Sequence, residues 1–215
     1  MICLLFDNDG TLIQSELLCC EALAERYLAE KNISLDAHTL FSRFRGWKLA
    51  DMLDTIQSET GVAWDSEFVK RYRNRMNTLL EDKLLPIDGV EEALSALPQK
   101  KAVVSNGPRN KIIDSMRITG LEKYFNGHIF SAYDIDIWKP EPGLFLHAAK
   151  EMGYAPSNCF VVEDSLPGVE AAISAGMTTF FYNKYNDTCE FANVIQFQSM
   201  HDLPHLISNQ EKQFL

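Results

Sequence analysis

The chain has 215 residues, of which 46% are apolar and 23% are charged, as in ordinary globular proteins. This length suffices for one large domain, or for one domain that carries an insertion. The formal net charge of −10 argues against a nonspecific nucleic-acid binder and against a protein that adheres to anionic membranes, so any positive charge that an anionic ligand needs must be local.

The apolar runs and the cysteines indicate where the protein works. No apolar run approaches the roughly 18 residues of a membrane span, so we expect no contact with a membrane. The first run, 2–6, has no basic flank and is followed at once by acids, which is not the pattern of a signal peptide. The five cysteines are odd in number and form no CxxC pair, which favours reduced thiols and a cytoplasmic location.

Short apolar runs alternate with helical patterns along most of the chain. Near-continuous apolar strands in such an alternation predict an α/β fold, a Rossmann-like parallel sheet with helices on both faces. The expected strands are 2–6, 101–105, 159–162 and 178–182, with a weaker run at 128–130. The expected helices between them are about 88–97, 108–119, 142–153 and 166–175.

One stretch interrupts this alternation. Between the first and second strands the sequence offers only helical patterns, at roughly 15–31, 37–44, 48–60 and 65–82. We therefore predict a core domain formed by 1–14 and 86–215, with a helical-bundle domain, 15–85, inserted into it.

The first strand runs directly into two carboxylates, Asp7 and Asp9. Residues i and i+2 of an extended chain point to the same side, and ligands of open α/β sheets bind at the carboxyl ends of the strands. Two acids this close repel each other unless a positive charge lies between them. Gly10 permits a sharp turn after them, although Asp-Gly is also a common pair in ordinary turns.

Three later segments bring more polar groups to the same edge. Ser105 and Asn106 follow the second strand, Lys139 lies in a loop stiffened by prolines, and Glu163 and Asp164 end another strand. Taken singly, these are also ordinary turn, loop and helix-start residues. Together they place four carboxylates at one edge, which requires a cation. Because only oxygen ligands are offered, Mg²⁺ is the natural ion.

In the order and chemistry of these motifs, the chain resembles the haloacid dehalogenase superfamily of phosphohydrolases over residues 3 to about 182. The helical insertion is similar to the α-helical cap of its β-phosphoglucomutase-like branch. Within that branch, segments 103–108 and 133–140 are most similar to the bacterial 6-phosphogluconate phosphatases. The motifs are Asp7-x-Asp9-Gly10-Thr11, Ser105-Asn106, Lys139-Pro140 and Glu163-Asp164.

The resemblance implies a Mg²⁺-dependent phosphatase that hydrolyses a small soluble phosphomonoester, a sugar or sugar-acid phosphate such as 6-phosphogluconate. It makes Asp7 the nucleophile that becomes an aspartyl phosphate, and Asp9 the general acid and then the general base. The implied Mg²⁺ ligands are Asp7, the Asp9 carbonyl and Asp164, with Glu163 bound directly or through water. The implied phosphate-binding groups are Ser105, Asn106 and Lys139.

Two alternatives remain open, and the cap carries a further expectation. A phosphomutase shares most of this site, but the arginine expected three residues after the cap glycine, Gly46, is replaced by Leu49. A noncatalytic, phosphate-responsive binding module is the other alternative. Within the cap, Arg45 and Lys48 are the expected specificity residues. We expect a small-molecule substrate as partner, no nucleic acid, and a monomer or weak homodimer.

Overall fold

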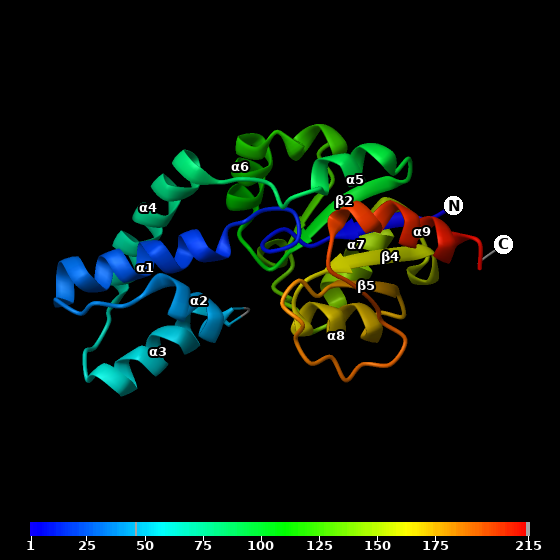
Figure 1. Ribbon diagram of the computed structural model, residues 1–215. Helices are drawn as coiled ribbons and strands as arrows, with labels where there is room; N and C mark the ends of the chain where they lie inside the picture. Colours follow the sequence, from blue (N-terminus) through cyan, green and yellow to red (C-terminus); the bar gives the residue numbers. More distant parts are fainter. Residues whose placement is uncertain (46, 214–215) are drawn as a thin grey trace. The chain divides into compact units, whose positions relative to one another are not determined.

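The computed structural model describes residues 1–45 and 47–213 (Figure 1). The chain forms two compact units. Met1–Ile13 and Pro86–Leu215 form the first, which we call the sheet unit, and Gln14–Leu85 form the second, the helical unit.

The sheet unit is built on a parallel sheet in the order β3-β2-β1-β4-β5-β6. Phe6 at the end of β1 lies between Val103 and Val162, so the carboxyl ends of the three central strands meet at one edge. The predicted α/β fold with a Rossmann-like parallel sheet is confirmed. The strands are β1 (Cys3–Phe6), β2 (Lys100–Ser105), β3 (Ile129–Ser131), β4 (Cys159–Glu163), β5 (Thr178–Tyr182) and β6 (Ile195–Phe197).

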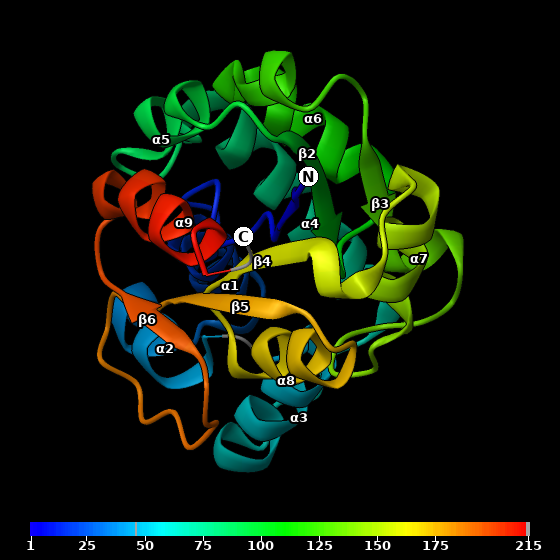
Figure 2. The same cartoon turned by 90° about the vertical axis from the view of Figure 1, so that its right-hand side faces the viewer.

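Helices cover both faces of this sheet. Figure 2 shows α5, α6 and α9 on one side and α7 and α8 on the other. On the α7–α8 side, alternate strand residues such as Leu5, Val104 and Val161 pack with the apolar faces of the two helices in one buried cluster. The helices are α5 (Val90–Ala96), α6 (Arg109–Thr119), α7 (Gly143–Met152), α8 (Leu166–Ser174) and α9 (Leu203–Glu211).

The last part of the described chain differs from the sequence prediction. Strand β6 and helix α9 lie outside the predicted elements. Met200, Leu203 and Ile207 are fully buried, so this segment belongs to the core of the sheet unit. A strand of three residues with a central glutamine has no apolar run that could reveal it. The side chains of His201 and His205 are exposed.

The helical unit contains α1 (Glu16–Lys31), α2 (Ala37–Phe44), α3 (Leu49–Thr60) and α4 (Ser66–Lys83). Residues from all four helices form one apolar cluster, in which the rings of Tyr27 and Phe68 meet edge to face at 5.0 Å. Helices α1 and α4 are also joined across their surface by an Arg71–Glu30 ion pair of 2.7 Å. This unit therefore has a core of its own.

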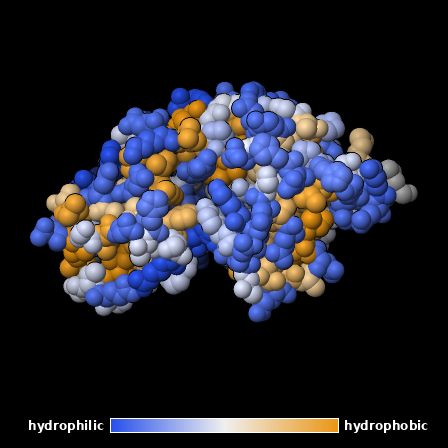
Figure 3. All heavy atoms as spheres, viewed as in Figure 1, coloured by the Kyte–Doolittle hydropathy of each residue, from blue (hydrophilic) through white to orange (hydrophobic). Residues whose placement is uncertain are grey.

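On the face shown in Figure 3, hydrophilic side chains predominate and apolar groups form only small patches. Among the helices of residues 1–45 and 47–213, none is both long and apolar enough to cross a membrane. The five cysteines, all within the described residues, form no disulfide bond with one another.

Candidate active site

Strand β1 delivers Asp7 into the centre of the carboxyl edge. The Asp7 N–H donates to the Val162 carbonyl at 2.9 Å, so the pairing with β4 continues one residue past the strand. The chain then turns at Gly10, whose φ of +85° is the left-handed region that glycine adopts readily. A Cβ atom at Gly10 would lie 2.1 Å from Asp164 Oδ2, so close approach as well as backbone conformation requires glycine here.

Lys139 joins the carboxylates of two strands. Its Nζ donates to Asp7 Oδ1 at 2.6 Å, to Glu163 Oε1 at 2.8 Å and to the Val104 carbonyl at 2.9 Å. These acceptors match the three hydrogens of an ammonium group. The lysine side chain is only 3% exposed, so it is fixed in the site rather than solvated.

Burial and charge act against each other in this pair. The pKa of Asp7 is raised to about 7, chiefly by burial and also by the repulsion of Glu163, although the attraction of Lys139 acts to lower it. Burial lowers the pKa of Lys139, but Asp7 and Glu163 outweigh it, so that pKa lies above its usual value. The lysine is therefore cationic, and further positive charge nearby would favour the ionised form of Asp7.

Asn106 and Ser105 lie at the end of β2. The Asn106 amide brackets the backbone of Lys139, since its Oδ1 accepts from the Lys139 N–H at 2.9 Å and its Nδ2 donates to the Lys139 carbonyl at 3.2 Å. The buried Ser105 Oγ accepts from the Gly107 N–H at 3.0 Å, and a hydroxyl that accepts a bond still carries its own hydrogen as a donor. Asn106 thus fixes the loop that carries the lysine.

Glu163, at the end of β4, is held on both carboxylate oxygens. Oε1 meets Lys139, while Oε2 accepts from the N–H of Ser165 at 2.6 Å and from its hydroxyl at 2.9 Å. The neighbouring Asp164 accepts from the Thr11 hydroxyl at 2.8 Å. Adjacent residues of one strand end thus have different surroundings, with Glu163 1% exposed and Asp164 half-buried.

Asp7, Glu163 and Asp164 together can hold a metal ion. One oxygen from each lies within 4.8 Å of the others. Of the four carboxylates at this edge, those of Asp7 and Glu163 contact the ammonium group of Lys139, and that of Asp9 contacts the ammonium group of Lys111. An all-oxygen donor set with this charge suits a hard divalent cation, and Mg²⁺ fits it.

The Asp9 carboxylate meets a residue that the sequence did not single out. Lys111, on the first turn of α6, donates from Nζ to Asp9 Oδ1 at 2.8 Å. No sequence signal distinguished this lysine from the many that lie on helix surfaces. Only the fold brings it to the loop after β1.

The two expected cap residues lie in the helical unit. Arg45 follows α2, with its guanidinium carbon 6.0 Å from the centre of the Phe41 ring, and the exposed Lys48 directly precedes α3. Gly46, on which the expected tight turn depends, lies outside the described residues. The role of this loop in substrate choice stays a prediction.

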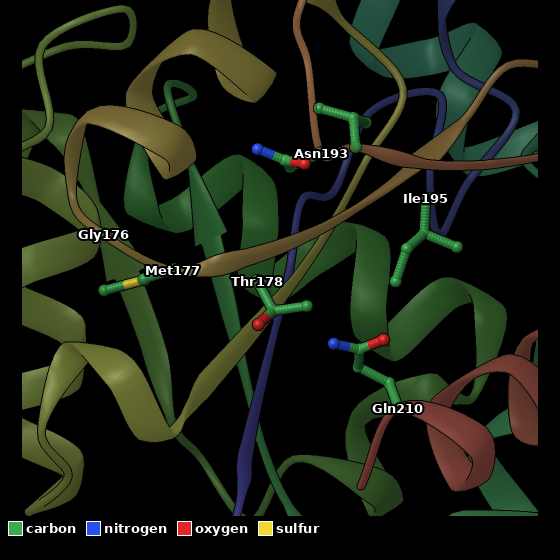
Figure 4. A pocket seen from close by; sticks show the side chains of 7 residues that line it. Gly176, Met177, Thr178, Asn193, Ile195 and Gln210 are labelled. Carbon is green, nitrogen blue, oxygen red and sulfur yellow. The ribbon is translucent and has the colours of Figure 1, made fainter. Parts of the chain in front are cut away.

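A cavity of about 470 Å³ lies elsewhere in the sheet unit (Figure 4). It is found where β5 and β6 begin, which in a parallel sheet is the edge opposite the carboxylates. Figure 4 shows Thr178, Ile195 and Gln210 around it. This cavity contains none of the predicted site residues. Its lining consists of Gly176, Met177, Thr178, Asn193, Val194, Ile195 and Gln210.

Comparison with known proteins places this geometry in a family. The family model of haloacid dehalogenase-like hydrolases matches residues 2–176. The chain is 38% identical to 6-phosphogluconate phosphatase of Escherichia coli over 204 residues, which cover 94% of this chain and 92% of that protein. It is 29% identical to a phosphorylated carbohydrates phosphatase of Thermotoga maritima over 185 residues, with 84% of both chains covered. Among solved structures, a haloacid dehalogenase-like protein of unknown function from Agrobacterium tumefaciens superimposes with a TM-score of 0.85 and 29% identity, covering 98% of this chain and 99% of that one.

Proposed function

Because the chain belongs to the haloacid dehalogenase-like hydrolases, we propose that it is a Mg²⁺-dependent phosphatase that cleaves a small phosphomonoester through an aspartyl phosphate on Asp7. The observation that carries this proposal is the Asp7 carboxylate itself. It lies at the carboxyl edge of the sheet, with Lys139 on one oxygen and two further carboxylates within 4.8 Å.

The proposed reaction has two steps. In the first, an Asp7 oxygen attacks phosphorus, the bond from phosphorus to the leaving oxygen breaks, and Asp9 gives its proton to that oxygen. In the second, Asp9 takes a proton from a water molecule as that water attacks phosphorus. The bond between Asp7 and phosphorus then breaks, and inorganic phosphate leaves with the Asp7 carboxylate and the protonated Asp9 both restored.

The other residues of the site stabilise charge and fix positions. Lys139 and the Ser105 hydroxyl neutralise the oxygens of the phosphoryl group, and the rigid placement of Lys139 supports this role. The contacts of Asn106 with the Lys139 backbone support a positioning role for the amide. Asp7, the Asp9 carbonyl and Asp164 would hold Mg²⁺, with Glu163 beside them. When bound, the ion supplies positive charge that balances the carboxylates and the phosphoryl oxygens.

The substrate proposed is a sugar or sugar-acid phosphate. The E. coli relative acts on 6-phosphogluconate by its name, and 38% identity over nearly the whole chain supports the same class here. We assign the helical unit the role of a cap that selects the substrate. With a net charge of −10, recognition of a second anionic group requires a local cation, and Lys48 before α3 is our candidate.

The decisive experiment measures phosphate release from p-nitrophenyl phosphate and from 6-phosphogluconate, with Mg²⁺ and with EDTA. We expect release only with Mg²⁺, and a fall of several orders of magnitude in kcat for Asp7→Asn, which removes the nucleophile but keeps its size. Asp202→Asn, the same change at an exposed site before α9, serves as the control and should keep full activity. Full activity in EDTA or in Asp7→Asn would exclude this function.

A further inference from the structure

The Asp9 carboxylate accepts a hydrogen bond on each oxygen, one from Lys111 of helix α6 and one from its neighbour Asn8. Lys111 and Ser115 are four residues apart and therefore lie on one face of the helix. Lys111 Nζ donates to Asp9 Oδ1 at 2.8 Å. Ser115 Oγ donates its hydrogen to the Ile112 carbonyl at 2.8 Å and lies 3.4 Å from Asn8 Oδ1, and Asn8 Nδ2 donates to Asp9 Oδ2 at 3.3 Å. Each oxygen of this carboxylate thus has its own donor.

The pair of Lys111 and Asp9 differs from the surface ion pairs of the same unit. Its side chains are 21% and 26% exposed, whereas those of Lys123 and Glu91 are 58% and 49% exposed at a similar distance of 2.7 Å. An ion pair exposed to solvent gains too little energy to hold its two side chains firmly in one geometry. Asn8 and Ser115, on the other side of the carboxylate, are buried. The geometry is that of a group held in one orientation.

We propose that Lys111 is a positioning residue that keeps the Asp9 carboxylate oriented for proton transfer. This inference rests on the proposed function, in which Asp9 takes a proton from water in the second step. A short carboxylate side chain can rotate away from its task, and a misplacement of about 1 Å costs on the order of 100-fold in rate. Lys111 and Asn8 prevent that rotation, so that each phosphorylated Asp7 meets a base already in place.

The choice of substrate separates this role from others. The leaving group of p-nitrophenyl phosphate needs little protonation, so formation of the aspartyl phosphate depends weakly on Asp9, whereas its hydrolysis still requires the base. Loss of orientation should therefore slow the second step and spare the first. In that case kcat and KM fall together while kcat/KM stays near the wild-type value. A substrate-binding role for Lys111 would instead raise KM.

The test compares Lys111→Met and Lys111→Arg with a matched control, Lys123→Met, which removes a lysine from an exposed ion pair of the same unit. Rapid-quench measurement with p-nitrophenyl phosphate gives the rates at which the phosphoenzyme forms and decays. We expect decay in Lys111→Met to be about 10- to 100-fold slower, with formation within about threefold of wild type. Lys111→Arg, which keeps a cationic donor, should recover most of the decay rate, and Lys123→Met should match wild type.

Three outcomes overturn the proposal. Unchanged decay in Lys111→Met removes the role, and a raised KM with unchanged decay makes Lys111 a substrate ligand. If the rates of phosphoenzyme formation and decay fall equally in Lys111→Met, and both Lys111→Met and Lys111→Gln have a lowered Tm, the role of the lysine is structural. An additivity check uses Asp9→Ala, because adding Lys111→Met to that variant should not slow decay further. If wild type shows neither phosphate release nor a phosphoenzyme, the proposed function itself fails, and the role of Lys111 fails with it.

Discussion

Replacement of Gly168 by alanine sets two physical effects against each other. Gly168 is the third residue of α8, and alanine is about 0.8–1.0 kcal/mol more favourable than glycine within a helix. A Cβ atom at this position, however, would lie 1.9 Å from Glu163 Oε1 and 2.0 Å from Glu163 Cδ. The glutamate carboxylate must therefore move if alanine is accommodated.

The structure indicates which effect is larger. The displaced carboxylate would lose its 2.8 Å contact with Lys139 and its 2.6 and 2.9 Å bonds from Ser165. Breaking a buried charge pair costs about 3–5 kcal/mol, because it leaves a charge uncompensated. After the gain in helix propensity, the free energy of unfolding of Gly168→Ala should be lower by about 2–4 kcal/mol.

Urea unfolding of four proteins measures this: wild type, Gly168→Ala, Glu163→Ala and the double variant. In the Glu163→Ala background the carboxylate is absent, so Gly168→Ala should become neutral or stabilising by up to about 1 kcal/mol. This change of sign is the signature of the clash. A stabilised Gly168→Ala in the wild-type background, or an equal cost in both backgrounds, would refute the reasoning.

Two predictions concern the substrate. Lys48→Ala should lower kcat/KM for 6-phosphogluconate by roughly 10- to 150-fold, which corresponds to about 1.5–3 kcal/mol for a lost charge-assisted contact. The kcat/KM for p-nitrophenyl phosphate should be nearly unaffected. Equal losses on both substrates would indicate a folding or closure defect instead. With β-glucose 1-phosphate the enzyme should release phosphate rather than form glucose 6-phosphate, because Leu49 stands where the mutase pattern has an arginine. Efficient conversion to glucose 6-phosphate, with little free phosphate, would make it a mutase.

The parts of the fold that the sequence predicted are those with strong local signals. The buried strands β1, β2, β4 and β5 are apolar runs in the sequence, and each of the helices α1 to α8 lies in a predicted helical segment. Strand β6 has only three residues, which are too few for such a signal. Its strand conformation depends on its pairing with β5. Helix α9 has only two buried apolar residues, Leu203 and Ile207, so its stripe is too narrow to detect from sequence.

In the site, too, some features could be predicted from the sequence and others could not. Asp7, Glu163 and Asp164 could be grouped in advance because they end parallel strands, and strand ends of a parallel sheet share an edge. Two contacts could not be predicted, that of Asn106 with the Lys139 backbone and that of Lys111 with Asp9. In each, a side chain bonds to a segment far away in the chain. Strand order predicts which groups share an edge, whereas the orientation of each group depends on tertiary contacts.

The raised pKa of Asp7 links metal binding to pH. Burial raises this pKa to about 7, and a metal ligand must be deprotonated, so Mg²⁺ competes with a proton for the carboxylate. The ionised fraction of a group with this pKa rises from roughly 9% at pH 6 to roughly 91% at pH 8, so the apparent Mg²⁺ affinity should rise about tenfold over that range.

Without metal, pH acts in the opposite direction, because a rise in pH lowers the stability of the protein, whereas it strengthens Mg²⁺ binding. This contrast can be tested. Since the pKa of folded Asp7 lies above its unfolded value of 3.8, the folded state binds more protons between about pH 4 and 7. The stability of the metal-free protein should therefore fall as pH rises through that window, while the stabilisation gained from added Mg²⁺ should grow. Calorimetric titration with Mg²⁺ at pH 6 and pH 8, in buffers of different ionisation enthalpy, measures both the affinity and the protons released. As a control, Asp202→Asn should behave as wild type. If the wild-type protein instead has equal Mg²⁺ affinities at the two pH values and releases no proton, Asp7 is already ionised before the metal binds.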